Sequence, residues 1–181
     1  IFAIIGFLLI KKSKDVSAEK PELQFSFNPA KELAGPLKTI MRDKGLLVCA
    51  LAETIFYSVG IVLVFAVTSL GKFEFQLSDL NRSLLLIPLT IGIGIGCFLA
   101  GRVNHTKMNR GLAVPGLLGM TGFLCLLANC ETPKIAAISL LFTGIFGGIF
   151  ILPVKVYLQE QTPGAQRGRI LAAENIIVFM G

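Results

Sequence analysis

Two charged side chains interrupt long apolar runs and are the first candidates for chemistry. Glu53 lies seven residues after the start of the run 46–70, and Lys155 lies near the end of the run 135–157. At about 1.5 Å of helical rise per residue, Glu53 is about 10 Å from the beginning of its run. Inside a membrane such groups are costly and face a cavity or a charged partner. Glu53 is predicted either to contact a cationic group or exchange a proton, or to pair with Lys155 as a structural contact.

Lys155 and the basic residues after it each have two interpretations. Lys155 either binds a phosphate group or anchors its helix at the aqueous interface through its long side chain. Arg167 and Arg169 are predicted to be gate or anchor residues, with contact to lipid phosphate as the second interpretation. Glu174 is expected in the first turn of the last helix, where a carboxylate complements the helix dipole. The substrate-binding candidates are therefore Glu53 and Lys155.

No set of residues in the sequence is typical of an enzyme or a metal site. The one histidine, His105, has no second histidine or nearby carboxylate with which to bind a metal or act as a base. The cysteines fall in or beside apolar runs without metal-binding spacing, and they are predicted to be buried free thiols. They are Cys49, Cys97, Cys125 and Cys130. We expect no catalytic residue, no metal and no cofactor.

Glycines recur within the apolar runs and are interpreted as helix-packing residues. Gly92, Gly94 and Gly96 do not form a dinucleotide-binding loop, because no strand precedes them and no acidic residue follows about twenty residues later. In a membrane helix, glycines four residues apart let a neighbouring backbone approach closely. Pro88 should kink its helix, since it removes a backbone hydrogen bond. The residues predicted to pack helices are Pro88, Gly92, Gly94, Gly144 and Gly148.

The composition excludes an ordinary soluble domain. Hydrophobic residues make up 54% of the 181 residues and charged residues only 15%, and the mean hydropathy is +0.75. Such values are typical of an integral membrane protein. The net charge of +6 does not indicate nucleic-acid binding, because no basic patch alternates with aromatic residues that could stack on bases. The sequence therefore predicts an all-α polytopic membrane protein.

The apolar runs divide the chain into a partial helix, a linker and a bundle. Residues 1–10 are predicted to end a transmembrane helix, 11–45 to form a cytoplasmic linker, and 46–181 to form the transmembrane bundle. The linker ends in an amphipathic helix expected along the membrane interface, with Leu33, Leu37, Ile40 and Met41 on one face. The spans are expected at about 46–70, 84–100, 112–129, 135–157 and 170–181, the last of them truncated. Because both ends fall in apolar runs, we expect an internal fragment.

Basic residues are distributed unevenly between the two sides of these spans. Fourteen of the lysines and arginines lie in residues 11–45, 101–111 and 155–169, and only Lys72, Arg82 and Lys134 lie on the other side. Loops rich in lysine and arginine stay in the cytoplasm. The three basic loops are therefore predicted to be cytoplasmic.

A long basic linker followed by hairpins with short basic inner loops resembles the middle and second half of a major facilitator superfamily transporter. Residues 28–51 resemble the linker and the entry to helix seven of its lysophospholipid transporter branch. Residues 92–115 resemble the loop between helices eight and nine, and 152–175 the connection from helix ten to helix eleven. This resemblance implies a bundle that runs from the end of helix six to the start of helix eleven.

The resemblance also implies a function. It implies a secondary transporter that moves a lysophospholipid across the bacterial inner membrane by alternating access, together with a six-helix N-terminal half that this sequence lacks. Relatives of this branch are often fused to, or encoded beside, an acyltransferase. Its gating segments would correspond to Gly96, Gly101, Arg102, Lys107, Arg167, Gly168 and Arg169. Gly101 and Asn104 depart from the superfamily pattern, which has an aspartate and a glycine there, so the acidic gate partner is absent.

Two alternatives remain open from the sequence. One is efflux of drugs or other small amphiphiles, which would gain support from an unpaired, proton-coupling Glu53. The other is a membrane anchor without transport activity for a fused acyltransferase. The expected partners are membrane lipids and a lysophospholipid, with no nucleic acid.

Overall fold

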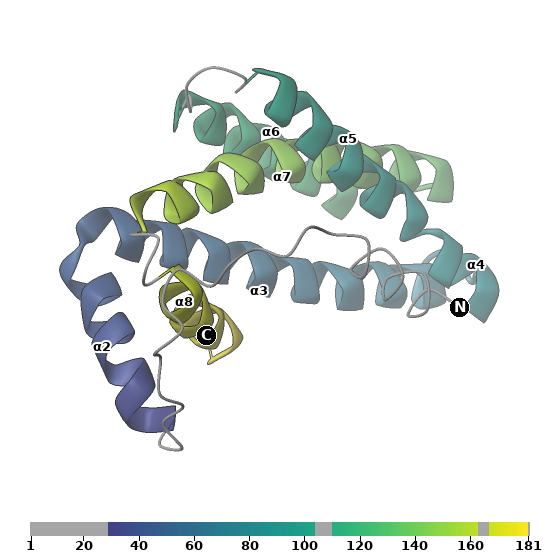
Figure 1. Ribbon diagram of the computed structural model, residues 1–181. Helices are drawn as coiled ribbons and strands as arrows, with labels where there is room; N and C mark the ends of the chain where they lie inside the picture. Colours follow the sequence, from purple (N-terminus) through teal and green to yellow (C-terminus); the bar gives the residue numbers. More distant parts are fainter. Residues whose placement is uncertain (1–28, 104–109, 163–166, 181) are drawn as a thin grey trace, which may run out of the picture.

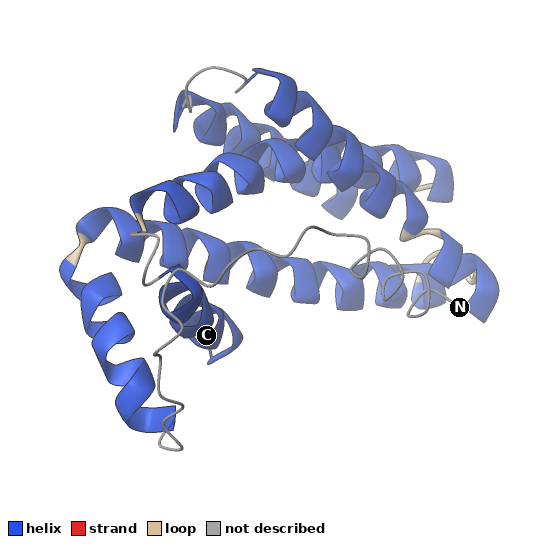
Figure 2. Ribbon diagram, viewed as in Figure 1, coloured by secondary structure: helices blue, strands red, loops and turns tan. Residues whose placement is uncertain are grey.

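The computed structural model describes residues 29–103, 110–162 and 167–180, and within these ranges the chain is helical apart from short turns (Figure 2). The expected all-α fold is confirmed, and the described ranges contain no strand. The predictions for residues 1–10 and 11–28 lie outside the described residues. The helices are α2 (Pro29–Arg42), α3 (Lys44–Phe73), α4 (Asp79–Leu84), α5 (Ile87–Val103), α6 (Ala113–Ala128), α7 (Pro133–Gln161) and α8 (Arg167–Met180), with a 3-10 turn, η1, at Arg110–Leu112.

Three helical segments of the described chain are long and apolar enough to cross a membrane. They are α3, the pair α4–α5 taken together over Asp79–Val103, and α7. Helix α6 is apolar but has only 16 residues. The end of the bundle where α3 begins and α7 ends carries Lys44, Arg102 and Arg167, and we call it the basic end.

Local side-chain chemistry fixes where the two longest helices begin. The Asp43 carboxylate accepts hydrogen bonds from the backbone N–H groups of Gly45 and Leu46, at 2.8 and 3.2 Å. Thr132 caps α7 by accepting from the Ile135 N–H at 3.4 Å, and Pro133 occupies the first turn, where no backbone donor is needed. The first backbone N–H groups of a helix have no carbonyl oxygen of a preceding turn to donate to. These caps accept hydrogen bonds from some of them.

The turn between α3 and α5 differs from the expected loop. The sequence predicts a loop over residues 71–82, but α3 continues to Phe73 and α4 already begins at Asp79. The chain turns again at 85–86, so Pro88 is the second residue of α5. A proline in a first turn removes no helical hydrogen bond. The disruption expected at Pro88 is therefore present as the break at 85–86, which lies just before the proline and not within α5.

The helices form two layers (Figure 1). Helices α5, α6 and α7 pack closely together in one, and α3 lies beside α7 with α2 and α8 against it. The core at the basic end includes Ile40, Leu46, Leu158 and Ile170 from four different helices. Ile40 is completely buried, while Leu37 and Met41 of the same helix are exposed. Helix α2 therefore packs against the bundle through Ile40.

Glycines bring α5 and α7 together. A Cβ atom at Gly148 would lie 2.5 Å from the Ile93 carbonyl oxygen and 2.7 Å from the Cys97 nitrogen. Added Cβ atoms at Gly92 and Gly144 would likewise meet backbone atoms of the opposite helix. Backbone can approach backbone this closely only where both helices lack side chains.

Two of the glycine expectations need correction. Gly94 has no heavy atom within 4 Å of an added Cβ, so it packs against nothing among the described residues. Its position on α5 faces away from α7. Gly96, expected in a gating segment, is buried in the middle of α5, where an added Cβ would meet the Ile145 carbonyl oxygen. Gly96 is a packing residue because it lies one turn after Gly92 on the same helix face.

Candidate functional site

Three charged side chains from three helices meet inside the bundle. Lys155 of α7 forms an ion pair with Glu53 of α3, and its Nζ lies 3.9 Å from Oε1 of Glu174 on α8. Both carboxylates are buried, with 0% and 1% of their side chains exposed, whereas 31% of the Lys155 side chain is exposed. We call these three residues the charged cluster.

The charged cluster lies at one depth because each helix contributes its residue at a similar distance from the basic end. Glu53 and Glu174 follow the first residues of α3 and α8 by nine and seven positions, and Lys155 precedes the last residue of α7 by six. At about 1.5 Å per residue, these offsets correspond to roughly 9–14 Å. The sequence indicated this depth for Glu53, and the interpretation that pairs Glu53 with Lys155 agrees with the ion pair in the structure.

The role expected for Glu174 is wrong. Helix α8 begins at Arg167 rather than at Ile170, so Glu174 lies two turns inside the helix and cannot cap it. Its Oε1 is buried and has no hydrogen-bond partner among the described residues. The sequence did contain a signal that Glu174 lies deep in its helix. If Arg167 and Arg169 are counted as part of the helix, Glu174 is seven residues past the helix start and about as deep as Glu53.

The charges of the cluster do not balance when both carboxylates are ionised. One ammonium then faces two carboxylates, and the second carboxylate is the more distant one. Tyr57 adds its ring to the group, with the Lys155 Nζ 5.9 Å from the ring centroid. A buried charge without a full partner is costly. The cluster therefore favours a further positive charge or a proton near Glu174.

A cavity of about 610 Å³ lies between α3 and α8 next to this cluster. Tyr57, Ser58 and Asn175 give it polar groups, while the rest of its lining is aliphatic or aromatic. Its volume falls within the roughly 300–1,000 Å³ of ligand sites in proteins. Asn175, which follows Glu174 on α8, lines this cavity. The arrangement suits a molecule with a polar and an apolar part.

The expected gating residues lie at the basic end, except for Lys107, which lies outside the described residues. Arg102 is exposed, and its guanidinium lies 4.8 Å from the centre of the Phe98 ring. A Cβ at Gly101 would make ordinary contact with Leu152, at 3.8 Å. Arg167, Gly168 and Arg169 are exposed in the first turn of α8. The structure does not bring these residues together with the charged cluster.

The four cysteines are free thiols, as expected. Cys49 is buried, Cys97 and Cys130 are partly buried, and Cys125 is exposed, so the expectation of burial is wrong for Cys125. It lies on a face of α6 that no described helix covers. The Cys97 thiol contacts the Gly148 carbonyl oxygen at 3.8 Å. The described residues contain no group of His, Cys, Asp and Glu side chains suited to a metal.

Comparisons with known proteins agree with this architecture. The family model described as Major Facilitator Superfamily matches residues 1–181. The chain is also similar to the lysophospholipid transporter LplT of Photorhabdus laumondii subsp. laumondii, with 28% identity over 142 residues. The match covers 76% of this chain and 35% of the relative, so the chain spans about a third of the length of that protein. No solved structure matches.

Proposed function

Because the chain belongs to the major facilitator superfamily, we propose that the protein is a transporter that moves a lysophospholipid across the inner membrane. The observation that carries this proposal is the cavity between α3 and α8, which combines polar groups with apolar walls beside the charged cluster. A lysophospholipid has the matching structure, with one acyl chain and a polar headgroup. The similarity to a lysophospholipid transporter supports the same substrate class.

The chemistry of the cluster supports a headgroup contact. Lys155 is the only member with appreciable solvent exposure, so its ammonium is the group most available to a phosphate. Glu53 would hold Lys155 in place through the ion pair. Transport would proceed by alternating access, in which this bundle rocks against an N-terminal bundle around a site near the membrane midplane. The loops at the basic end would then face the cytoplasm.

Transport by the full-length protein in proteoliposomes tests this proposal. Inward movement of a fluorescent lysophosphatidylethanolamine is followed, with a diacyl phosphatidylethanolamine as the control. Flux of the single-chain lipid alone is the expected result, and Lys155→Ala should reduce it at least tenfold. No flux of the lysophospholipid, together with proton-dependent efflux of a cationic dye, would contradict the proposal and favour drug export. Drug export would be supported by an unpaired Glu53. The pairing of Glu53 with Lys155 therefore weighs against it.

The anchor alternative makes a different prediction in the same assay. A membrane anchor for a fused acyltransferase would leave lysophospholipid flux at the level of empty liposomes. We expect flux from the membrane part of the full-length protein alone, with any soluble enzyme domain removed. If flux requires an active acyltransferase domain, the protein does not transport by itself.

A further inference from the structure

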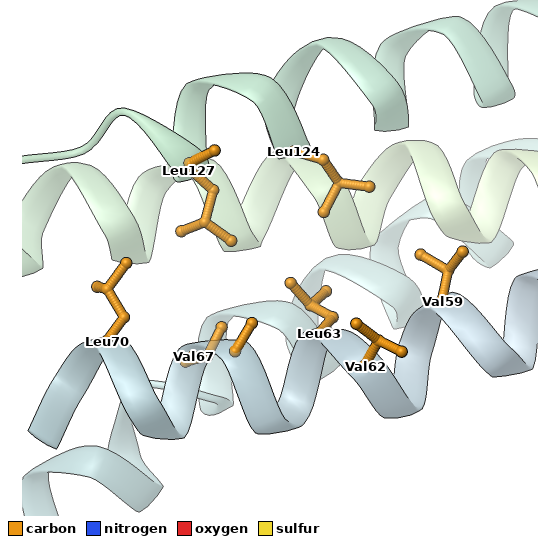
Figure 3. Close-up of a pocket in the computed structure, with 9 residues that line it drawn as sticks. Val59, Val62, Leu63, Val67, Leu70, Leu124 and Leu127 are labelled. Carbon is orange, nitrogen blue, oxygen red and sulfur yellow. The ribbon is translucent and has the colours of Figure 1, made fainter.

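Two apolar cavities follow α3 from the charged cluster toward the end away from the basic end. One, of about 270 Å³, lies between α3 and α6, and Figure 3 shows Leu124 and Leu127 above Leu63 and Leu70 across it. The other, of about 230 Å³, lies nearer the cluster and includes Tyr57 in its lining. Both cavities are lined by Val59, Leu63 and Leu124. The two cavities therefore adjoin each other along α3, and we call them together the α3 trough.

The length of the α3 trough matches one acyl chain. From Tyr57 to Leu70 the helix rises about 20 Å, at about 1.5 Å per residue. The hydrocarbon core of a bilayer is about 30 Å thick and holds two leaflets, so one acyl chain spans about 15 Å. A chain that begins near Tyr57 can thus lie along α3 without leaving the trough.

The lining of the trough is too apolar to hold water. Its walls are almost entirely hydrocarbon, and cavities of that kind stay dry. A flexible hydrocarbon chain fits these limits.

The polar end of the occupant is fixed by the position of the charges. Tyr57 lines the trough at one end and lies beside Lys155, whereas Leu70 and Leu127 line the other end. A charged headgroup at the leucine end would have no polar partner in the lining. We propose that the α3 trough binds the single acyl chain of the transported amphiphile. Its headgroup would lie at Tyr57, which also lines the cavity between α3 and α8, and its chain end at Leu70 and Leu127. This inference rests on the proposed function for the identity of the amphiphile.

One glycine allows the trough to be filled without disturbing the fold. Gly60 lines the trough, and an added Cβ there meets no heavy atom within 4 Å. A leucine side chain at this position would enter the space of the acyl chain. Gly94 is equally open but lies on α5, outside the lining of the trough. Gly60→Leu and Gly94→Leu are therefore a matched pair, since both place the same side chain in open space on a helix.

Photocrosslinking of the full-length protein tests the assignment. The probe is a lysophosphatidylethanolamine with a diazirine at the end of its acyl chain, and peptide mass spectrometry locates the crosslinks. We expect crosslinks at the lining residues Leu63, Val67, Leu70, Leu124 and Leu127. Gly60→Leu should lower their yield at least tenfold, while Gly94→Leu leaves it unchanged. Crosslinks confined to outward-facing residues such as Phe65, which is 74% exposed, would overturn the inference.

Crosslinking and transport separate the two proposals. Transport by the wild type with crosslinks that miss the trough leaves the function standing and removes the binding site. Crosslinks in the trough without transport keep the site and remove the function. If Gly60→Leu lowers crosslinking in the trough but transports at the wild-type rate, the trough is not on the transport path and the inference is wrong.

Discussion

At the scale of single residues, the molecule is organised around Lys155. This one ammonium is shared by carboxylates on two other helices, so it offsets the cost of burying both. Removing one partner of a buried pair leaves the other charge uncompensated, at a cost of about 3–5 kcal/mol. The three members therefore differ in how much their loss should cost. Loss of Lys155 leaves two buried carboxylates without a cationic partner, whereas loss of Glu53 leaves none.

Substitution of Lys155 should destabilise the protein more than substitution of Glu53. Lys155→Ala is expected to lower the free energy of unfolding by about 3 kcal/mol, whereas Glu53→Gln leaves Lys155 with Glu174 and costs less. Thermal unfolding of the full-length protein in detergent measures both. The double variant, Lys155→Ala with Glu53→Gln, should be more stable than Lys155→Ala alone, because only one buried carboxylate then lacks a cationic partner. Equal losses in the two single variants would contradict the shared role of Lys155.

Ser139 offers a test of an unpaired buried hydroxyl. Its side chain is completely buried, and its Oγ has no hydrogen-bond partner among the described residues. Because an unsatisfied buried polar group costs about 1–3 kcal/mol, Ser139→Ala is expected to leave stability unchanged or raise it by about 1 kcal/mol. Ser58→Ala is the control, since that hydroxyl donates to the Thr54 carbonyl oxygen at 2.8 Å. A clear loss of stability in Ser139→Ala alone would show that the hydroxyl is paired.

At the scale of the elements, the two layers are held together in different ways. Helices α5, α6 and α7 pack backbone against backbone or against rings, as at Gly116, whose added Cβ would lie 2.7 Å from the Phe150 nitrogen. Helix α3 contacts α7 less extensively and leaves the trough beside it. Helix α8 contacts α2 and α3, and its charged link to α7 is Glu174. The first layer is therefore the rigid part of the bundle.

Adding a methyl group at Gly148 should disrupt that rigid layer. Gly148→Ala places a Cβ 2.5 Å from the Ile93 carbonyl oxygen, a backbone atom that cannot turn away. Overpacking of this kind costs about 1–3 kcal/mol, so the melting temperature in detergent should fall by several degrees. Gly94→Ala is the matched control, because its Cβ meets nothing and alanine favours helix by about 1 kcal/mol over glycine. Equal melting temperatures of Gly148→Ala and Gly94→Ala would contradict the prediction.

At the scale of the whole molecule, the distribution of basic residues predicts the orientation in the membrane. Fourteen of the seventeen lysines and arginines lie in the segments assigned to one side. The turn between α6 and α7, which holds Cys130, then faces the opposite side. The charge asymmetry thus predicts which cysteine an external reagent reaches.

Cys130 should react with a membrane-impermeant maleimide added outside intact cells. In the full-length protein with its other cysteines changed to serine, Cys130 is expected to be labelled, while an added Gln159→Cys at the basic end is labelled only after the cells are opened. Burial raises the pKa of the Cys130 thiol above its ordinary 9, and a backbone hydrogen bond partly offsets this. Since the thiolate is the reactive form, labelling should rise about tenfold per pH unit from pH 7 to 8. The reverse labelling pattern would invert the orientation.

The helices could be predicted from the sequence because each apolar run is long and uniform. The ends of the helices were harder, because Asp79–Leu84 and Arg167–Arg169 are polar segments that nevertheless form helix. This error hid Glu174, since a residue assigned to a first turn is interpreted as a cap. The pairing of Glu53 with Lys155 could be predicted as one alternative. The sequence alone does not show that α8 lies beside this pair and brings Glu174 to it.

The trough was not foreseeable from any motif. It depends on the spacing between α3 and α6, and valine and leucine at these positions are as typical of a filled core as of a cavity. Gly60 carried no signal either, because glycines that pack and glycines that face open space look the same in sequence. Gly92 and Gly94 illustrate this, two residues apart on one helix with opposite surroundings.

The crossing of α5 and α7 has a consequence for how this protein can diverge. Where two side chains touch, enlargement of one can be offset by reduction of the other, and the pair can drift together through evolution. At Gly92, Gly144 and Gly148 an added Cβ meets peptide oxygen and nitrogen atoms. No exchange of side chains on the opposite helix makes room for it. Distant descendants should therefore keep these glycines while the aliphatic residues between them are replaced freely.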